Sequence, residues 1–317
     1  PLGTWWPMLL VVSLPIYTYI MQTNRLVCTY TILAILPTYA SYRSMTGPRH
    51  MVFFSLLSGV LIYLGFIAKG PVAFFTFAVP AIAWVALKAK FSRAAVSTLL
   101  AMAAFALVLS ATFHVFPESA DFWKGFWKAQ VVASLKSERA AGDTHWYLVE
   151  RWTAEMAVPV AITGFFMALT KTSFRQLRFS RHALFFLLIG LASSLPFLIS
   201  TRQHNRYIFQ SYPFFVLSLA FAADSIAAAI ESILSDRQRL RAAIGAIALI
   251  FFVAALTGML YKKDHIRGRK PFYKDIYMQK IELPARTTIS ACPGAMIHSD
   301  WLFADMMRVY NCLLYTF

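Results

Sequence analysis

Lys69 is the residue whose setting first indicates chemistry. It lies in LGFIAKGPVAFF, residues 64–75, where an apolar run meets a lysine, a glycine and a proline and then becomes apolar again. An ionisable side chain is costly at membrane depth and usually serves a function there. Gly70 permits close backbone approach, and Pro71 suits the first position of a new helix, whose N–H groups add positive potential. The pattern predicts a phosphate site at the lipid–water boundary, although a lysine that only snorkels to the interface fits it too.

A second cationic stretch is STRQHNRYIFQSYPFF, residues 200–215. It places Arg202, His204 and Arg206 in one tight turn, followed by Tyr207 and an apolar helix. Short outer loops normally avoid arginine, and arginine binds phosphate in a bidentate manner. We therefore expect this turn to share the phosphate site. The alternative is that it anchors the chain to lipid headgroups, with Tyr207 as an interfacial aromatic residue.

A third polar stretch, GDTHWYLVERW at residues 142–152, directly precedes an apolar run. His145, Tyr147 and Glu150 combine hydrogen-bonding, aromatic and acidic groups, a set that suits a sugar or a polar headgroup. The alternative is an ordinary interfacial belt in which Glu150 and Arg151 are solvated.

Apolar helices must position these groups. Of the 317 residues, 59% are hydrophobic and 14% are charged, whereas an ordinary soluble domain has about 25% charged residues. Backbone groups in lipid must bond within helices or closed barrels, and long apolar runs without alternation select helices. The sequence predicts an all-α polytopic membrane protein. Its nine helical segments are expected at residues 5–21 (broken by Pro15), 25–42, 51–68, 71–87, 94–116, 152–170, 183–200, 207–230 and 242–260.

The net charge of +16 is explained by the positions of the basic residues and does not require a nucleic-acid partner. Most are in short loops between apolar runs, as the positive-inside rule expects, and no nucleic-acid-binding motif is visible, so nucleic acid is not an expected partner. Alternation assigns the basic loops 43–49, 88–93, 171–181 and 237–241 to the cytoplasm, and Lys69-Gly70, 117–151, 202–206 and the tail to the outside. The basic stretch 262–270 alone argues the reverse; outside, it would contact anionic membrane lipids.

The two longest segments between or after the apolar runs have structure of their own. In the loop 117–151, Phe122, Trp123, Phe126 and Trp127 beside lysines predict a helix in the membrane interface or a packed helical cap. The tail predicts a small C-terminal extramembrane α/β unit, which gives two domains, 1–260 and 261–317. Two of the three cysteines, Cys292 and Cys312, either pair outside the cytoplasm or remain free thiols, and Cys28 is expected to be packed in a span.

The strings YLGFIAKGPVAFF and, about 130 residues later, RQHNRYIFQSYPFFVLSLAFA resemble the C-type glycosyltransferases (GT-C). More narrowly, the chain resembles the bacterial relatives of protein O-mannosyltransferase and of the lipid A aminoarabinose transferase, and the resemblance covers nearly all of residues 1–260. The resemblance implies a multi-pass protein of the bacterial inner membrane, with a periplasmic tail and active site. It also implies metal-dependent or metal-assisted transfer of a sugar from a polyprenyl-phosphate donor to a lipid, glycan or protein. Lys69 would contact the lipid phosphate, and Arg206 and Tyr207 would lie near the same phosphate or the lipid carrier.

Two departures from the family pattern concern the acid–base chemistry. The family's main catalytic acid lies in its first external loop, which we expect upstream of Pro1, and Asn24 stands where many relatives have Asp. The external acids available in this chain are Asp121, Glu138, Asp143 and Glu150, and none of them is assigned as the base. A divalent metal ion is the only expected cofactor; no His or Cys cluster predicts zinc. A transporter or flippase of a lipid-linked substrate, or a non-catalytic membrane subunit, remains the alternative.

Overall fold

The computed structural model describes residues 5–17, 26–47, 49–127, 132, 146–173, 177, 179–199, 205–235 and 257. Backbone contacts divide the chain into two units, Pro1–Asp236 and Arg237–Phe317. Nearly all described residues belong to the first unit. The expected helix at 242–260 and the tail 261–317 lie outside them, so the count of nine segments, the boundary at 260 and the C-terminal α/β unit remain predictions.

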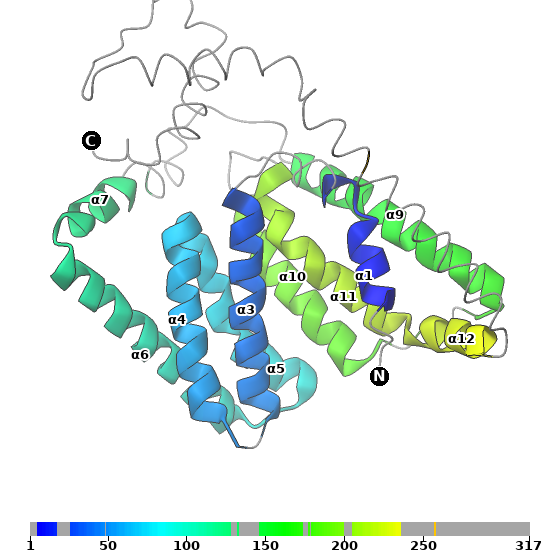
Figure 1. The fold of residues 1–317 in the computed structure, drawn as a ribbon, viewed down its shortest axis with the longest axis horizontal. Helices are drawn as coiled ribbons and strands as arrows, with labels where there is room; N and C mark the ends of the chain where they lie inside the picture. The colour runs from blue at the N-terminus through cyan, green and yellow to red at the C-terminus, as the bar shows by residue number, and fades with distance from the viewer. Residues whose placement is uncertain are drawn as a thin grey trace, which may run out of the picture. The chain divides into compact units, whose positions relative to one another are not determined.

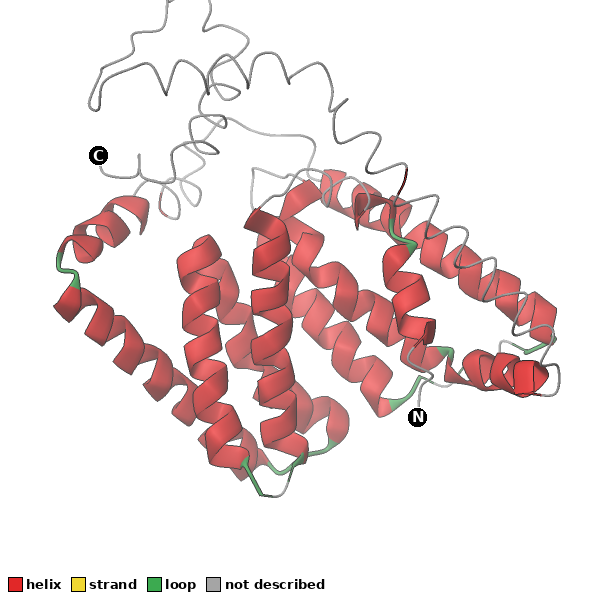
Figure 2. Cartoon of the chain, in the orientation of Figure 1, coloured by secondary structure: helices red, strands yellow, loops and turns green. Residues whose placement is uncertain are grey.

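The described part of the first unit is helical, and no strand occurs in it (Figures 1 and 2). An all-α fold is therefore confirmed for this part of the chain. Its helices are α1 (Trp5–Val12), α3 (Leu26–Thr46), α4 (Met51–Lys69), α5 (Val79–Leu87), α6 (Phe91–Val115), α7 (Glu118–Phe126), α9 (Tyr147–Thr170), α10 (Arg181–Ile199), α11 (Tyr212–Ala222) and α12 (Asp224–Ser235), with 3₁₀ helices η1 (Gly70–Ala78) and η4 (Asn205–Ser211).

Several stretches are long and apolar enough to cross a membrane. Among the described residues these are Met51–Leu87, Phe91–Val115 and Tyr147–Thr170, and the bent pair Tyr207–Ala222 and Asp224–Ser232 adds a fourth if it is one span. These helices are consistent with a membrane protein. The 37-residue stretch Met51–Leu87 is not one straight rod, because the Phe66 and Phe74 rings stack with centroids 5.3 Å apart. Such a contact requires the chain to fold back between them, as Figure 1 shows for α4 and α5.

The basic loops that we expect on one side of the membrane do meet at one end of the helices. Arg93, at the start of α6, donates from Nε to the carbonyl of Ser44 near the end of α3, at 2.8 Å. Tyr42 and His182 bring the start of α10 to the same place, with 3.3 Å between Oη and Nε2. The reversal at Lys69 lies at the opposite end of α4 (Figure 1). The predicted alternation is thus confirmed for α3 through α6, whereas the assignment of sides to cytoplasm and periplasm remains a prediction.

One proline and one carboxylate explain why the helical segment expected at 5–21 is broken. Helix α1 ends at Val12, before Pro15, which has no N–H to donate to the preceding turn. The next N–H, of Ile16, donates to Oε2 of Glu155 in α9 at 2.7 Å.

The segment expected at 207–230 also differs from one straight helix: it begins as η4 and bends by 60° between Ala222 and Asp224.

Helices α3, α4 and α6 meet through small residues and serines. The hydroxyls of Ser41 and Ser58 lie 2.9 Å apart, and Ser97 joins Ser44 at 2.8 Å and Ser55 at 2.9 Å. A Cβ added at Gly59 would lie 2.2 Å from the carbonyl oxygen of Ala101, so α4 and α6 are in backbone contact there. Close approach through small residues and hydroxyl pairs is typical of helices packed within membranes.

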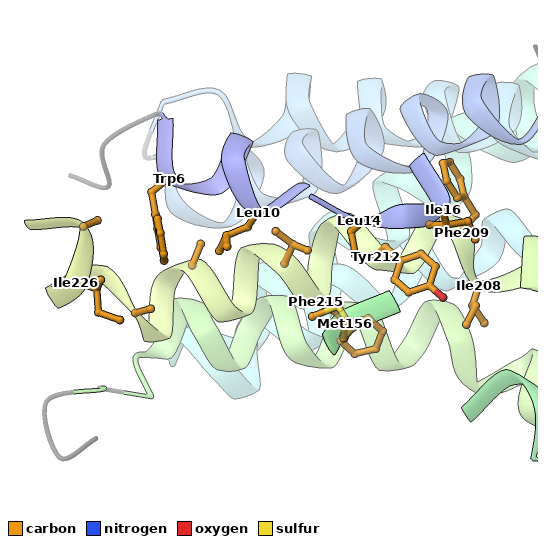
Figure 3. Close-up of a cluster of buried hydrophobic side chains, with 14 of the residues drawn as sticks. Trp6, Leu10, Leu14, Ile16, Met156, Ile208, Phe209, Tyr212, Phe215 and Ile226 are labelled. Atoms are coloured by element: carbon orange, nitrogen blue, oxygen red, sulfur yellow. The ribbon is translucent and has the colours of Figure 1, made fainter. Parts of the chain in front are cut away.

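A second core lies where α1, α9, η4 and α11 meet (Figure 3). Trp6, Leu10 and Leu14 line up along α11, and on the opposite side of that helix its own Phe215 lies beside Met156 of α9, as the close-up shows. All five are buried. This core fixes η4 and the first turn of α11 against α9, and so determines where the polar residues of η4 point.

Candidate functional site

The site begins at the turn where α4 ends and η1 starts. Lys69 is the last residue of α4, and Gly70 follows with φ of +76°, a backbone conformation that favours glycine. A Cβ added at Gly70 would also lie 3.0 Å from the Phe126 ring of α7. Pro71 then lies in the first turn of η1, where a residue without a free N–H costs nothing. The helix junction predicted from Lys-Gly-Pro is therefore confirmed, and it fixes the lysine at a helix end.

Three side chains from other helices surround the half-buried Lys69. Its Nζ donates to Oε1 of Gln210 at 3.0 Å. The same nitrogen lies 4.8 Å from the ring centroid of Tyr30 and 5.8 Å from that of Phe197. Aromatic faces attract an ammonium group, most strongly where water is excluded. The lysine is thus oriented by residues from α3, α10 and η4, and is not a side chain that extends alone toward an interface.

Gln210 is the residue that joins η4 to the lysine. It is completely buried, and both ends of its amide are used: Oε1 accepts from Lys69 and Nε2 donates to the carbonyl of Ser193 in α10 at 3.3 Å. Lys69 and Gln210 are 141 residues apart in sequence. The fold therefore brings the two stretches that the sequence singled out into direct contact.

The other predicted residues of the second stretch lie on or before η4. Tyr207 stacks on Phe197, with ring centroids 5.2 Å apart. Lys69 also contacts the Phe197 ring, so Tyr207 and Lys69 have this neighbour in common. Arg206 belongs to the backbone of η4, but its side chain lies outside the described residues, as do Arg202 and His204. Convergence with Lys69 is thus established for η4 and Tyr207, and the arginine contacts remain predictions.

The third stretch packs on a different part of η4. Tyr147 packs against the core that contains Ile208 and Phe209, and the guanidinium of Arg151 lies 5.5 Å from the Tyr147 ring centroid. Glu150 is exposed on the first turn of α9, and His145 lies outside the described residues. A sugar-binding role for Tyr147 and Glu150 stays a prediction, because their described contacts are with this core and not with Lys69.

Helix α7 has features of both predicted arrangements, the packed helical cap and the helix in the membrane interface. Trp123 stacks on Phe66 with centroids 4.1 Å apart, and Phe126 covers Gly70, so one face is packed on the α4–η1 turn. Phe122 and Trp127 are each 48% exposed. Aromatic residues on the open face are typical of a helix at a membrane interface. Helix α7 therefore lies directly beside the Lys69 site.

Sequence reasoning missed Gln210, Tyr30 and Glu155. Gln210 lies within the second cationic stretch but carries no charge, and Tyr30 lies in an apolar run, so only the fold reveals that they meet Lys69. Glu155 had a usable signal, since a carboxylate within a long apolar helix is costly and indicates a specific partner. Its partner is the backbone N–H of Ile16. Within the described ranges, no group of three His, Cys, Asp or Glu side chains could hold a metal ion.

Comparison with protein-family models, with curated proteins and with solved structures found no match to this chain.

Proposed function

We propose that this chain is an integral membrane glycosyltransferase that uses a polyprenyl-phosphate sugar donor, with Lys69 contacting the donor phosphate. The observation that carries the proposal is the 3.0 Å hydrogen bond from Lys69 to Gln210. It brings a lysine at a helix junction to the element that also contains Arg206 and Tyr207. An ammonium held among aromatic rings, with an arginine-bearing helix beside it, suits an anion whose lipid tail remains in the bilayer.

The chemistry needs a cation where the leaving group gains charge. The bond between C1 of the sugar and the phosphate oxygen breaks, a new bond forms between C1 and an acceptor oxygen, and the polyprenyl phosphate leaves with the electron pair. The acceptor proton passes to a carboxylate base, which we expect outside the described residues. Lys69 would stabilise the developing negative charge on the phosphate, and cations placed there lower the barrier. A divalent metal ion would assist by polarising the same oxygens.

The inner membrane of a bacterium, with the Lys69 turn and the C-terminal tail on the periplasmic side, is the proposed location. The basic links that meet at the far end of α3, α6 and α10 support this orientation, since positively charged loops favour the cytoplasm.

A transporter or flippase of a lipid-linked substrate is the second candidate. The 60° bend between α11 and α12 favours it, because broken helices line the substrate paths of many transporters. The two functions differ in their product. A flippase moves the intact lipid, whereas a transferase separates the sugar from the phosphate.

The test is an assay of the full-length protein in lipid nanodiscs with a radiolabelled polyprenyl-phosphate sugar. We expect the label to leave the lipid. Lys69→Met should reduce this transfer at least 100-fold, because methionine keeps the length of the side chain and loses its charge. The control is Lys90→Met, which removes an exposed lysine at the opposite end of the helices.

Two results would contradict the proposal. If the label stays on the lipid but crosses the bilayer of a proteoliposome, the protein is a flippase. If Lys69→Met and Lys90→Met transfer sugar as fast as the wild type, Lys69 has no part in the reaction.

A further inference from the structure

The hydroxyl of Tyr30 is an unusual feature of the Lys69 site. Tyr30 is completely buried, and among the residues that the structure describes none accepts a hydrogen bond from its Oη. A buried hydroxyl without a partner is unfavourable, because the hydrogen bonds that it made to water in the unfolded chain are not replaced. Native proteins keep few such groups, so each one calls for a physical explanation.

The position of the Tyr30 ring is fixed on two sides. One face of the ring carries the ammonium of Lys69, at 4.8 Å from the centroid. The ring edge also packs on α4 at Gly65, which has no side chain; a Cβ added there would lie 3.8 Å from Cε2 of Tyr30. The ring therefore cannot turn to find another acceptor without losing these contacts. Its hydroxyl is thus held on a ring that contacts the lysine that we propose as the phosphate ligand.

We propose that the Tyr30 hydroxyl donates a second hydrogen bond to the anion bound at Lys69, so that lysine and tyrosine together hold one phosphate group. This inference rests on the proposed function and names a further ligand residue for its site. A phosphate has several oxygens, and one of them can accept from the ammonium while another accepts from the phenol. Phenylalanine in place of tyrosine would keep the cation–π contact and lose the donor.

The experiment measures binding of polyprenyl phosphate to the full-length protein in detergent, with polyprenol, which lacks the phosphate, as the reference ligand. We expect Tyr30→Phe to weaken polyprenyl phosphate binding about 10-fold or more, since hydrogen bonds to charged groups contribute about 1.5–3 kcal/mol. Polyprenol binding should not change. Without lipid, Tyr30→Phe should melt at the wild-type temperature or above it, because it removes an unsatisfied polar group. The matched control is Tyr39→Phe, on an exposed tyrosine of the same helix.

The outcomes separate this inference from the proposed function. Equal binding of polyprenyl phosphate by Tyr30→Phe and wild type, or equal losses for polyprenyl phosphate and polyprenol, would overturn the role of the hydroxyl and leave the proposed function standing. A lower melting temperature without lipid would show that the hydroxyl supports the fold, which also overturns it. Failure of the wild type to prefer polyprenyl phosphate over polyprenol would instead contradict the proposed function.

Discussion

Two polar regions of this protein differ in how fully their buried polar side chains are hydrogen-bonded. In the interface of α3, α4 and α6, the buried serines bond to one another or to backbone carbonyls, for example Ser97 with Ser44 and Ser55. Around η4 the pattern changes. Ser211 of η4 still donates to the carbonyl of Ile208, but the buried hydroxyls of Tyr30 and Tyr212 and the indole N–H of Trp152 have no hydrogen-bond partner within the described part of the chain.

The difference supports the proposal that one region serves helix packing and the other serves ligand binding. Hydroxyl pairs between closely packed helices stabilise an apolar bundle, and once satisfied they have nothing left to offer a ligand. Unsatisfied donors lower stability unless something else bonds to them. The region around η4 also contains the half-buried lysine and the left-handed turn at Gly70. Unused buried donors call for a physical explanation, and a ligand that accepts from them is one.

The largest expected effect lies in the packed region. Gly59→Ala should destabilise the protein by roughly 1–3 kcal/mol, because its Cβ would lie 2.2 Å from the carbonyl oxygen of Ala101 and 2.8 Å from Cβ of Ala104. The backbone at Ala101 cannot yield as a flexible side chain would. Thermal unfolding in detergent measures the loss. Gly164→Ala is the matched control, since a Cβ there meets nothing within 4 Å, and it should be neutral or slightly stabilising. Equal melting of both variants would show that α4 and α6 are not in backbone contact.

A smaller effect compares one hydroxyl from each region. Ser97→Ala should cost about 0.5–1.5 kcal/mol, because it removes a group that bonds both Ser44 and Ser55. Tyr212→Phe should leave the melting temperature unchanged or raise it, since the buried Tyr212 hydroxyl has no partner to lose. Both variants are measured without lipid. The comparison fails if Tyr212→Phe destabilises the protein as much as Ser97→Ala does.

Much of the fold could be predicted because long apolar runs leave few options for the backbone. The runs expected at 51–68 and 71–87 correspond to α4 and to η1 with α5, and the Lys-Gly-Pro sequence marks the turn between them. Proline and glycine act locally, so their effects are readable from sequence alone. The 60° bend near Ala223 was not predictable, because no proline or glycine stands there.

The candidate site was only half visible in the sequence. Lys69 could be found, since a charge within an apolar run is conspicuous. Gln210 and Tyr30 could not, because a glutamine or tyrosine near a helix end is ordinary until another helix approaches it. Their contacts with Lys69 join residues from three separate segments, and such long-range packing leaves no local pattern.

The most direct test of the central claim is photo-crosslinking with a polyprenyl phosphate that has a diazirine beside the phosphate, followed by peptide mapping. The account predicts that the label attaches to the α4–η1 turn and to η4, and that Lys69→Met removes both crosslinks. Labelling confined to the opposite end of the helices, or labelling that Lys69→Met leaves unchanged, would contradict it.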